Sequence, residues 1–258
     1  MSNAKKVVVV GLGEIGRPLL KIIGKHFDAV GVDIAPLVGQ IRQVDVLHIC
    51  YPFEINDFVA ETADYIEQFK PALTVINSTV GIGTTRAVAG LTGARVVHSP
   101  VRGKHAKMQE DLYKYAKFVG AMDLDGGRQA AEHFESLGLK IRILSSPEAT
   151  ELAKLTETSY FGILIAWAQE VERFCDRLGT DYDEIVSFYE EIGFFPPVKY
   201  TPGIIGGHCV MPNIEILRRF DDSAILDAIR TSNRMKMKRE RRLSSEVEGR
   251  VPAGAVDK

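Results

Sequence analysis

The first 145 residues contain short apolar runs that alternate with longer amphipathic stretches. The first run, Val7–Val10, is continuous and β-branched, as expected for a strand buried on both faces of a parallel sheet. Stretches between the runs, such as 58–69, have the apolar face of a helix. This alternation predicts a Rossmann-type, doubly wound parallel α/β sheet, with strands over 7–10, 29–33, 44–50, 73–77, 95–98, 117–121 and 140–144.

The hydrophobic period changes at Glu148. From there to Leu178, apolar residues recur at three- and four-residue steps with one step of five, which predicts a long central helix that ends at Gly179. Shorter helices are predicted over 181–192, 214–220 and 224–237. The sequence therefore predicts an all-helical domain over 147–238, after a Rossmann domain over 1–146 and before a basic, disordered tail over 239–258.

The long helix carries apolar residues on more than one side. It therefore needs cover beyond a single buried face, either from the first domain or from a second copy of the chain. We expect a homodimer that forms through this helix, residues 148–178.

A glycine-rich turn follows the first strand and opens the first helix. In the G-x-G-x-x-G pattern, one glycine makes the turn, one admits a diphosphate to the helix N-terminus, and one packs helix on strand. Asp33, at the end of the second strand, suits the ribose hydroxyls of NAD and repels the 2′-phosphate of NADP. Another adenosine compound, or no ligand, is the alternative. The predicted cofactor-binding residues are Gly11, Gly13, Glu14, Ile15, Gly16, Asp33, Ser78 and Thr79.

Ser78 and Thr79 directly follow the fourth strand. Open α/β sheets bind ligands at the carboxyl ends of their strands, so these hydroxyls are candidates to face the nicotinamide or the substrate. The alternative is that Ser78 and Thr84 cap the next helix.

Cys209 stands in a glycine-rich loop between two predicted helices. The glycines Gly203, Gly206 and Gly207 let the backbone approach a ligand closely, and a thiol is readily activated as a nucleophile. A buried, inert cysteine in a tight turn is the alternative. The glycines and the adjacent His208 favour the reactive thiol.

The composition is that of an ordinary globular protein, with 45% hydrophobic and 26% charged residues and a net charge of −2. We therefore expect no nucleic-acid or membrane partner, and no apolar run has the length of a membrane span. The cysteines Cys50, Cys175 and Cys209 lie far apart without metal-ligand spacing, so we expect no metal site and a reducing, cytoplasmic setting.

Four places in the chain resemble the UDP-glucose/GDP-mannose dehydrogenase family, especially its UDP-N-acetylmannosamine-type members. The matching segments are Gly11–Gly16 with Asp33, Ser78–Thr85, Glu151–Leu155 and Gly206–Cys209, the last similar to the family's G-G-H-C. Their order and spacing agree from about residue 5 to residue 238.

The resemblance implies that NAD oxidises a sugar alcohol twice, through an aldehyde and a thioester, to a carboxylate. It implies that Cys209 is the nucleophile, that Lys154 stabilises oxyanion charge and that Thr79 lies near the nicotinamide. Without the resemblance, the sequence predicts that Lys154 is a solvated surface charge. A small-molecule substrate, such as a nucleotide sugar, is expected.

Several positions depart from the family pattern. Val101 replaces the glutamate of S-P-E-R, Asn213 replaces an aspartate, and Thr158 replaces an asparagine. Asn213 can orient a water but is a poor base, so hydrolysis of a thioester is in question. The chain is also expected to be truncated, without the family's C-terminal nucleotide-sugar-binding domain.

Two other functions fit the same residues. One is a short β-hydroxyacid or 6-phosphogluconate type of dehydrogenase, in which Lys154 serves acid–base chemistry and Cys209 is dispensable. The other is a non-catalytic NAD-binding or regulatory protein derived from such an enzyme.

Overall fold

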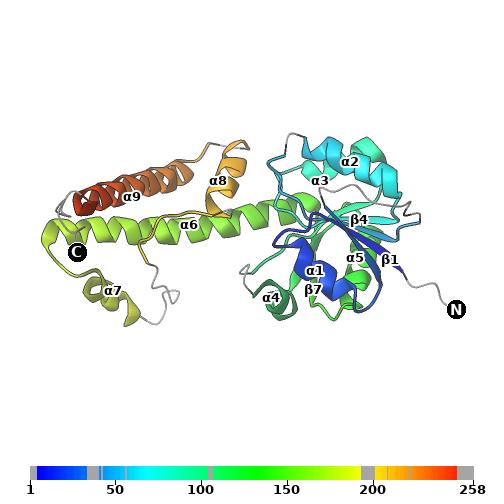
Figure 1. Cartoon of the computed structure of the whole chain (residues 1–258), viewed down its shortest axis with the longest axis horizontal. Coiled ribbons are helices and arrows are strands. Elements are labelled where there is room, and N and C mark those ends of the chain that lie inside the picture. The colour runs from blue at the N-terminus through cyan, green and yellow to red at the C-terminus, as the bar shows by residue number, and fades with distance from the viewer. Residues whose placement is uncertain are drawn as a thin grey trace, which may run out of the picture. The chain divides into compact units, whose positions relative to one another are not determined.

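The computed structural model of the chain describes residues 5–33, 41, 43–55, 57–103, 107–192, 201–207, 209–220 and 222–248. Contacts divide the chain into two compact units, Met1–Leu155 and Thr156–Lys258. The first unit is a sheet covered by helices, and the second consists of helices (Figure 1). The domain boundaries predicted at 146 and 238 remain predictions.

The first unit is built on a seven-stranded sheet with the order β2-β1-β3-β4-β5-β6-β7. Neighbouring strands are parallel except β5 and β6, which meet antiparallel through the single pair His98 and Gly120. The predicted doubly wound sheet is confirmed, and the antiparallel pairing of β6 is the difference. The short helix α4 (Met108–Lys114), between β5 and β6, does not carry the chain back across the sheet. The strands are β1 (Lys6–Val10), β2 (Asp28–Val32), β3 (Val46–Ile49), β4 (Leu73–Ile76), β5 (Val96–His98), β6 (Lys117–Gly120) and β7 (Ile141–Leu144).

Helices cover both faces of the sheet because side chains alternate along each strand. In β1, Val7 and Val9 belong to the core beneath α1, α4 and α5, while Val8 and Val10 belong to the core beneath α2 and α3. These helices are α1 (Gly16–Ile23), α2 (Phe58–Phe69), α3 (Thr84–Thr92), α4 (Met108–Lys114) and α5 (Leu124–Glu135).

A long helix, α6 (Pro147–Leu178), leads into the second unit, as the periodicity predicted. Its residues there pack against α8 (Val210–Arg218) and α9 (Ala224–Glu248) around a core that includes Ile214 and Ile229. A smaller core joins α6 to α7 (Tyr182–Glu190) through Val171, Cys175 and Val186.

The helix after the cysteine loop begins earlier than predicted. It starts at Val210, directly after Cys209, whereas the sequence predicted a start at Ile214. Pro212 therefore lies in the first turn, where its missing N–H breaks no intrahelical hydrogen bond.

The predicted tail is also wrong for residues up to Glu248, because α9 continues to that point. Positive charges in this stretch are paired with acids. Arg239 lies 3.0 Å from Glu172 and 2.6 Å from Asp176 of α6, and Glu240 pairs with Lys236 one turn earlier. These pairs stabilise the helix here without apolar packing, whereas the disordered tail was predicted because few apolar residues follow Ser244.

None of the helices in the described ranges combines the length and apolarity needed to cross a lipid bilayer. Among the same residues, no group of three or more His, Cys, Asp or Glu side chains is arranged to hold a metal ion.

Candidate active site

The glycine-rich turn after β1 is packed tightly against backbone atoms at its first and last glycines and has open space at the middle one. Gly11 has a φ of +88°, and a Cβ there would lie 2.6 Å from the backbone nitrogen of Tyr51. A Cβ on Gly16 would lie 1.8 Å from the carbonyl oxygen of Gly11, so only glycine lets α1 start this close to β1. A Cβ on Gly13 would meet no described heavy atom within 4 Å. This geometry fits the diphosphate of NAD.

The start of α1 supplies the next groups. Ile15 is the N-cap residue, and its own apolar side chain accepts no hydrogen bond from the first helical N–H groups. Such N–H groups favour an anion beside Glu14 and Ile15. Asp33 follows directly after β2 and is exposed.

Ser78 joins two loops at the same edge of the sheet. Its hydroxyl donates to the carbonyl oxygen of Tyr51 at 2.6 Å, and Tyr51 in turn packs beside Gly11. The Ser78 side chain is therefore used within the protein. Thr79 next to it is half-buried. Neither Ser78 nor Thr84 is the cap residue of α3, which begins at Thr84. Its N-cap residue is Gly83, which has no side chain to accept a hydrogen bond.

Lys154 is half-buried on α6, within the first unit. Two buried groups, His98 and Lys117, have pKa values that are lowered mainly by burial. The positive charge of Lys154 lowers both pKa values further. Lys154 therefore lies close enough to the carboxyl ends of the sheet strands to act on groups there.

Sequence reasoning missed Lys117, the first residue of β6. Its Nζ donates to the carbonyl oxygen of Ser99 at 2.6 Å and lies 4.8 Å from the ring centre of Phe134. Burial lowers the pKa of Lys117 to about 7, against an opposing influence from Cys50. A lysine directly before the apolar strand residues 118–121 was the only signal in the sequence.

Two buried histidines, His48 and His133, lie near Lys117. Nε2 of His48 lies 2.9 Å from Nε2 of His133, and Nδ2 of Asn77 lies 3.1 Å from Nδ1 of His48. Burial lowers the pKa of His133 to about 4 and that of His48 well below its usual value. Both rings are uncharged at pH 7, which fits their burial without a carboxylate partner.

Cys209 belongs to the second unit and is exposed. It is the N-cap residue of α8, where the helix dipole favours negative charge. Asn213, one turn later, is buried, and its Nδ2 donates to Oγ1 of Thr158 at 2.9 Å. His208 lies outside the described residues.

The cysteine loop is held by buried amides that sequence reasoning also missed. Asn233 of α9 accepts from the backbone nitrogen of Ile205 at 2.8 Å and donates to its carbonyl oxygen at 2.9 Å. Gln169 of α6 donates to the carbonyl oxygen of Gly203 at 2.7 Å and accepts from Ser232 at 2.9 Å. Such paired hydrogen bonds fix the backbone that leads to Cys209.

The predicted site residues therefore fall on two units. The glycine turn, Asp33, Ser78, Thr79 and Lys154 lie in the first, and Cys209 and Asn213 lie in the second. Val101, where the family has glutamate, is buried in the core of the first unit and offers no acid.

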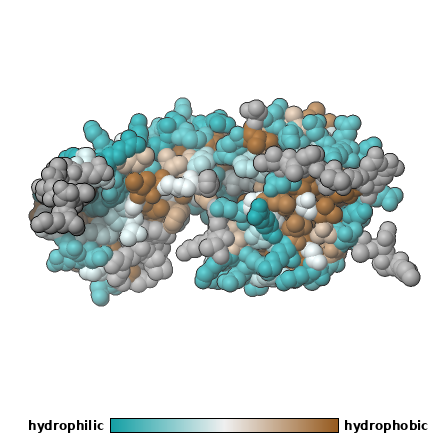
Figure 2. All heavy atoms as spheres, in the orientation of Figure 1, coloured by the Kyte–Doolittle hydropathy of each residue, from teal (hydrophilic) through white to brown (hydrophobic). Residues whose placement is uncertain are grey.

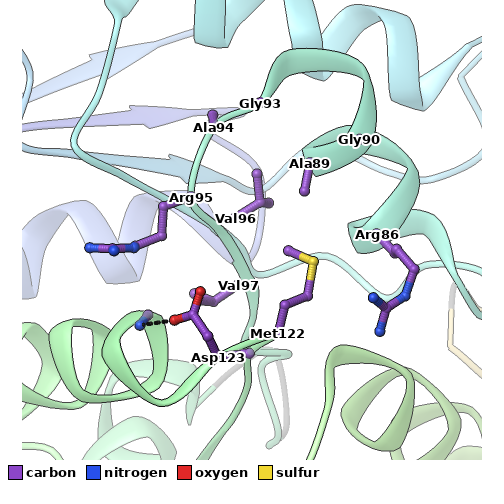
Figure 3. Close-up of a pocket in the computed structure, with 12 residues that line it drawn as sticks. Arg86, Ala89, Gly90, Gly93, Ala94, Arg95, Val96, Val97, Met122 and Asp123 are labelled. Atoms are coloured by element: carbon purple, nitrogen blue, oxygen red, sulfur yellow. Dashed lines mark hydrogen bonds between the residues drawn. The ribbon is translucent and has the colours of Figure 1, made fainter.

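A cavity of about 310 Å³ in the first unit lies at the amino end of β5, and none of the predicted site residues lines it. Figure 3 shows its apolar side chains between two arginines, Arg86 and Arg95. Both guanidinium groups already have protein partners, Glu148 and Gln129.

Comparisons with known proteins bear on both units. Residues 148–235 match the model of the UDP-glucose/GDP-mannose dehydrogenase family, central domain. The chain is 25% identical to UDP-N-acetyl-D-mannosamine dehydrogenase of Methanococcus vannielii over 80% of this chain and 59% of that protein. It thus spans less than two thirds of the length of such curated relatives.

Two solved structures share the fold. The UDP-N-acetyl-mannosamine dehydrogenase Cap5O from Staphylococcus aureus has a TM-score of 0.80 at 19% identity, covering 97% of this chain and 72% of that chain. The 3-hydroxyisobutyrate dehydrogenase of Mycobacterium tuberculosis has a TM-score of 0.71 at 16% identity, covering 91% of this chain and 93% of that chain.

Proposed function

We propose that the chain is an NAD-dependent oxidoreductase, starting from the match of residues 148–235 to the central-domain model of the UDP-glucose/GDP-mannose dehydrogenase family. Its substrate is a sugar, such as a nucleotide sugar, or another hydroxylated small molecule. The observation that carries the proposal is the glycine turn, which is packed at Gly11 and Gly16, open at Gly13, and adjacent to the loop of Ser78 and Thr79.

The turn and the first N–H groups of α1 would hold the diphosphate of NAD, and Asp33 would bind its ribose hydroxyls. NAD would accept the hydride that the alcohol loses. Lys154 would stabilise the negative charge that develops on the substrate oxygen, and Thr79 would face the reacting carbon. Cys209 would add to an aldehyde as a thiolate.

The chain has lost the groups that would hydrolyse a thioester. Asn213 is an amide and is hydrogen-bonded to Thr158, and Val101 is apolar and buried. Without a general base for water, a thioester on Cys209 would not be hydrolysed. We therefore expect multiple turnover only for the first two-electron oxidation, with the aldehyde released as product.

The test is to count NADH per substrate consumed, with NAD and a panel of UDP- and GDP-sugars, free sugars and hydroxy acids. We expect one NADH per substrate. We also expect Lys154→Met to lower turnover at least about 100-fold, because it removes a charge aimed at the reacting oxygen. Lys25→Met, which removes an exposed lysine, is the matched control.

Two NADH per substrate would contradict the single oxidation. No NADH, with NAD binding confirmed in the same preparation, would contradict the dehydrogenase. Full activity of Cys209→Ser would favour a mechanism without a covalent intermediate, as in the short β-hydroxyacid enzymes.

We also propose that two copies of the chain associate through α6. Tyr160, Trp167 and Phe174 recur every seven residues, so they lie on one side of the helix, and each is exposed, Trp167 to 54%. Exposed apolar rows of this kind mark association surfaces, and apolar surface is visible on the helical unit in Figure 2. A second copy presents the same row, so the surface is self-complementary.

Phe174→Glu is expected to convert the dimer to a monomer, because it places a charge at one end of the apolar row. Sedimentation velocity measures the mass, and Trp167, the single tryptophan, reports its environment by fluorescence. Phe188→Glu on α7 is the control, since Phe188 is even more exposed but lies off the row. A monomeric native protein, or a dimer that survives Phe174→Glu, would contradict the interface.

A further inference from the structure

Helix α3 is capped by a side chain from α6. Its own cap residue, Gly83, has a φ of +89° and no side chain to accept hydrogen bonds. Glu151, which has no exposed surface, takes that place: Oε2 accepts from the backbone nitrogen of Gly83 at 2.7 Å, and Oε1 accepts from that of Thr85 at 2.9 Å. The Thr85 hydroxyl also donates to Oε1, at 2.6 Å.

Two neighbours of Glu151 on α6 contact the same segment. Glu148 forms a two-point ion pair with Arg86 of α3, at 2.7 and 3.2 Å. Thr150 lies 2.8 Å from Nδ1 of His98, whose Nε2 lies 3.1 Å from the carbonyl oxygen of Ser78. Burial lowers the pKa of His98 to about 3, so the ring is neutral and can donate from Nε2 to Ser78 while it accepts from Thr150.

These contacts hold both ends of the loop that contains Thr79. His98 binds the carbonyl before it, and Glu151 binds the backbone after it. Lys154 follows Glu151 by three residues and Thr150 by four, so it lies on the same side of α6. The loop and Lys154 are therefore fixed to one short piece of helix.

We propose that Glu151 is the positioning residue of this site, which keeps Thr79 and Lys154 in one fixed arrangement. The inference rests on the proposed function in one respect only, the reaction that this arrangement serves. The role itself is a property of the first unit.

The chemistry of Glu151 explains why a carboxylate stands there. Burial raises its pKa, whereas the three donors from Gly83 and Thr85 favour the charged form, as does the amino end of α3. Glutamine has the same shape, but its NH₂ group would face a backbone N–H in place of an acceptor oxygen. Glu151→Gln would therefore leave a buried N–H without a partner.

Hydrogen exchange of backbone amides tests the proposal without any activity. In Glu151→Gln we expect exchange across residues 79–86 to accelerate about 10- to 100-fold, because one or two charge-assisted hydrogen bonds are lost. Asp57→Ala is the matched control: Asp57 caps α2 through the backbone nitrogen of Ala60 at 3.0 Å, so its loss should affect α2 alone. Thr85→Val removes only the hydroxyl donor and should give a smaller effect in the same segment.

The second readout separates positioning from general damage. We expect Glu151→Gln to lower kcat about 10- to 100-fold while the NAD dissociation constant, set by the glycine turn, changes less than about threefold. Unchanged exchange across 79–86 would overturn the proposal, and so would an equal loss of kcat and NAD affinity. If the native protein shows no turnover, the proposed function fails, and the exchange result still decides the role of Glu151.

Discussion

Gly16→Ala is expected to unfold the first unit, whereas Gly13→Ala is expected to fold normally and lose the cofactor. The Cβ of an alanine at 16 would lie 1.8 Å from the carbonyl oxygen of Gly11, which is backbone and cannot move without separating α1 from β1. We expect a loss of more than about 3 kcal/mol in the free energy of unfolding. An alanine Cβ at 13 meets no atom of the described residues within 4 Å, so we expect its methyl group to interfere with a bound ligand and not with the fold.

The measurements are urea denaturation and calorimetric titration with NAD. For Gly13→Ala we expect a free energy of unfolding within about 1 kcal/mol of the native value and an NAD affinity lowered at least about tenfold. Native-like NAD affinity in Gly13→Ala would show that the turn does not bind the cofactor. A stable, native-like Gly16→Ala would contradict the described packing of α1 on β1.

Lys117→Met is expected to stabilise the protein at pH 7, by about 1 to 3 kcal/mol. Burial lowers the pKa of Lys117 from 10.5 to about 7, so the folded state holds this amine at a cost. Methionine fills a similar volume without a charge. The lost hydrogen bond to Ser99 and the lost contact with Phe134 offset part of the gain.

The pH dependence has a definite sign. Between pH 7 and 10.5 the unfolded lysine binds more protons than the folded one, so this residue makes native stability rise with pH. The advantage of Lys117→Met should therefore shrink from pH 7 to pH 9. Measurements stop at pH 9 because of Cys50, whose pKa burial raises from 9.0 to about 12 in the folded protein. Above pH 9 the unfolded thiol loses its proton more readily than the folded one, which makes native stability fall with pH.

Urea unfolding of both proteins at pH 7 and pH 9 gives the comparison, and Lys140→Met removes an exposed lysine as the control. A destabilised Lys117→Met at pH 7 would mean that the amine supports the fold. A stabilised variant with reduced turnover would identify Lys117 as a group kept for function.

The sequence predicts the first unit well because its information is local. The strand Val7–Val10 is a continuous apolar run, and Gly11 and Gly16 each have a steric reason to be glycine. The direction of β6 was missed because it depends on where the chain crosses the sheet between residues 98 and 117. No residue type in that segment specifies a parallel or antiparallel return.

The supporting residues of the site could not be predicted in the same way. Glu151 caps a helix 66 residues earlier in the chain, and Asn233 binds a loop 28 residues before it. In the sequence, each of these residues is an ordinary polar residue of a predicted helix. Its partner becomes evident only when the fold brings the two segments together. The end of α9 was missed for the same reason, since its cations find acids on α6.

The parallel strands are synthesised before the helix that covers one of their faces, because β6 and α5 follow β5 in the chain. All five parallel strands are complete once His98 has been synthesised, but one face of β4 and β5 is covered by Ala130 and Phe134 of α5. At translation rates of about 5–20 residues per second, Val75 and Val97 stay uncovered for a few seconds. During this interval we expect the growing chain to expose an apolar sheet face, the kind of surface that favours aggregation until α5 covers it.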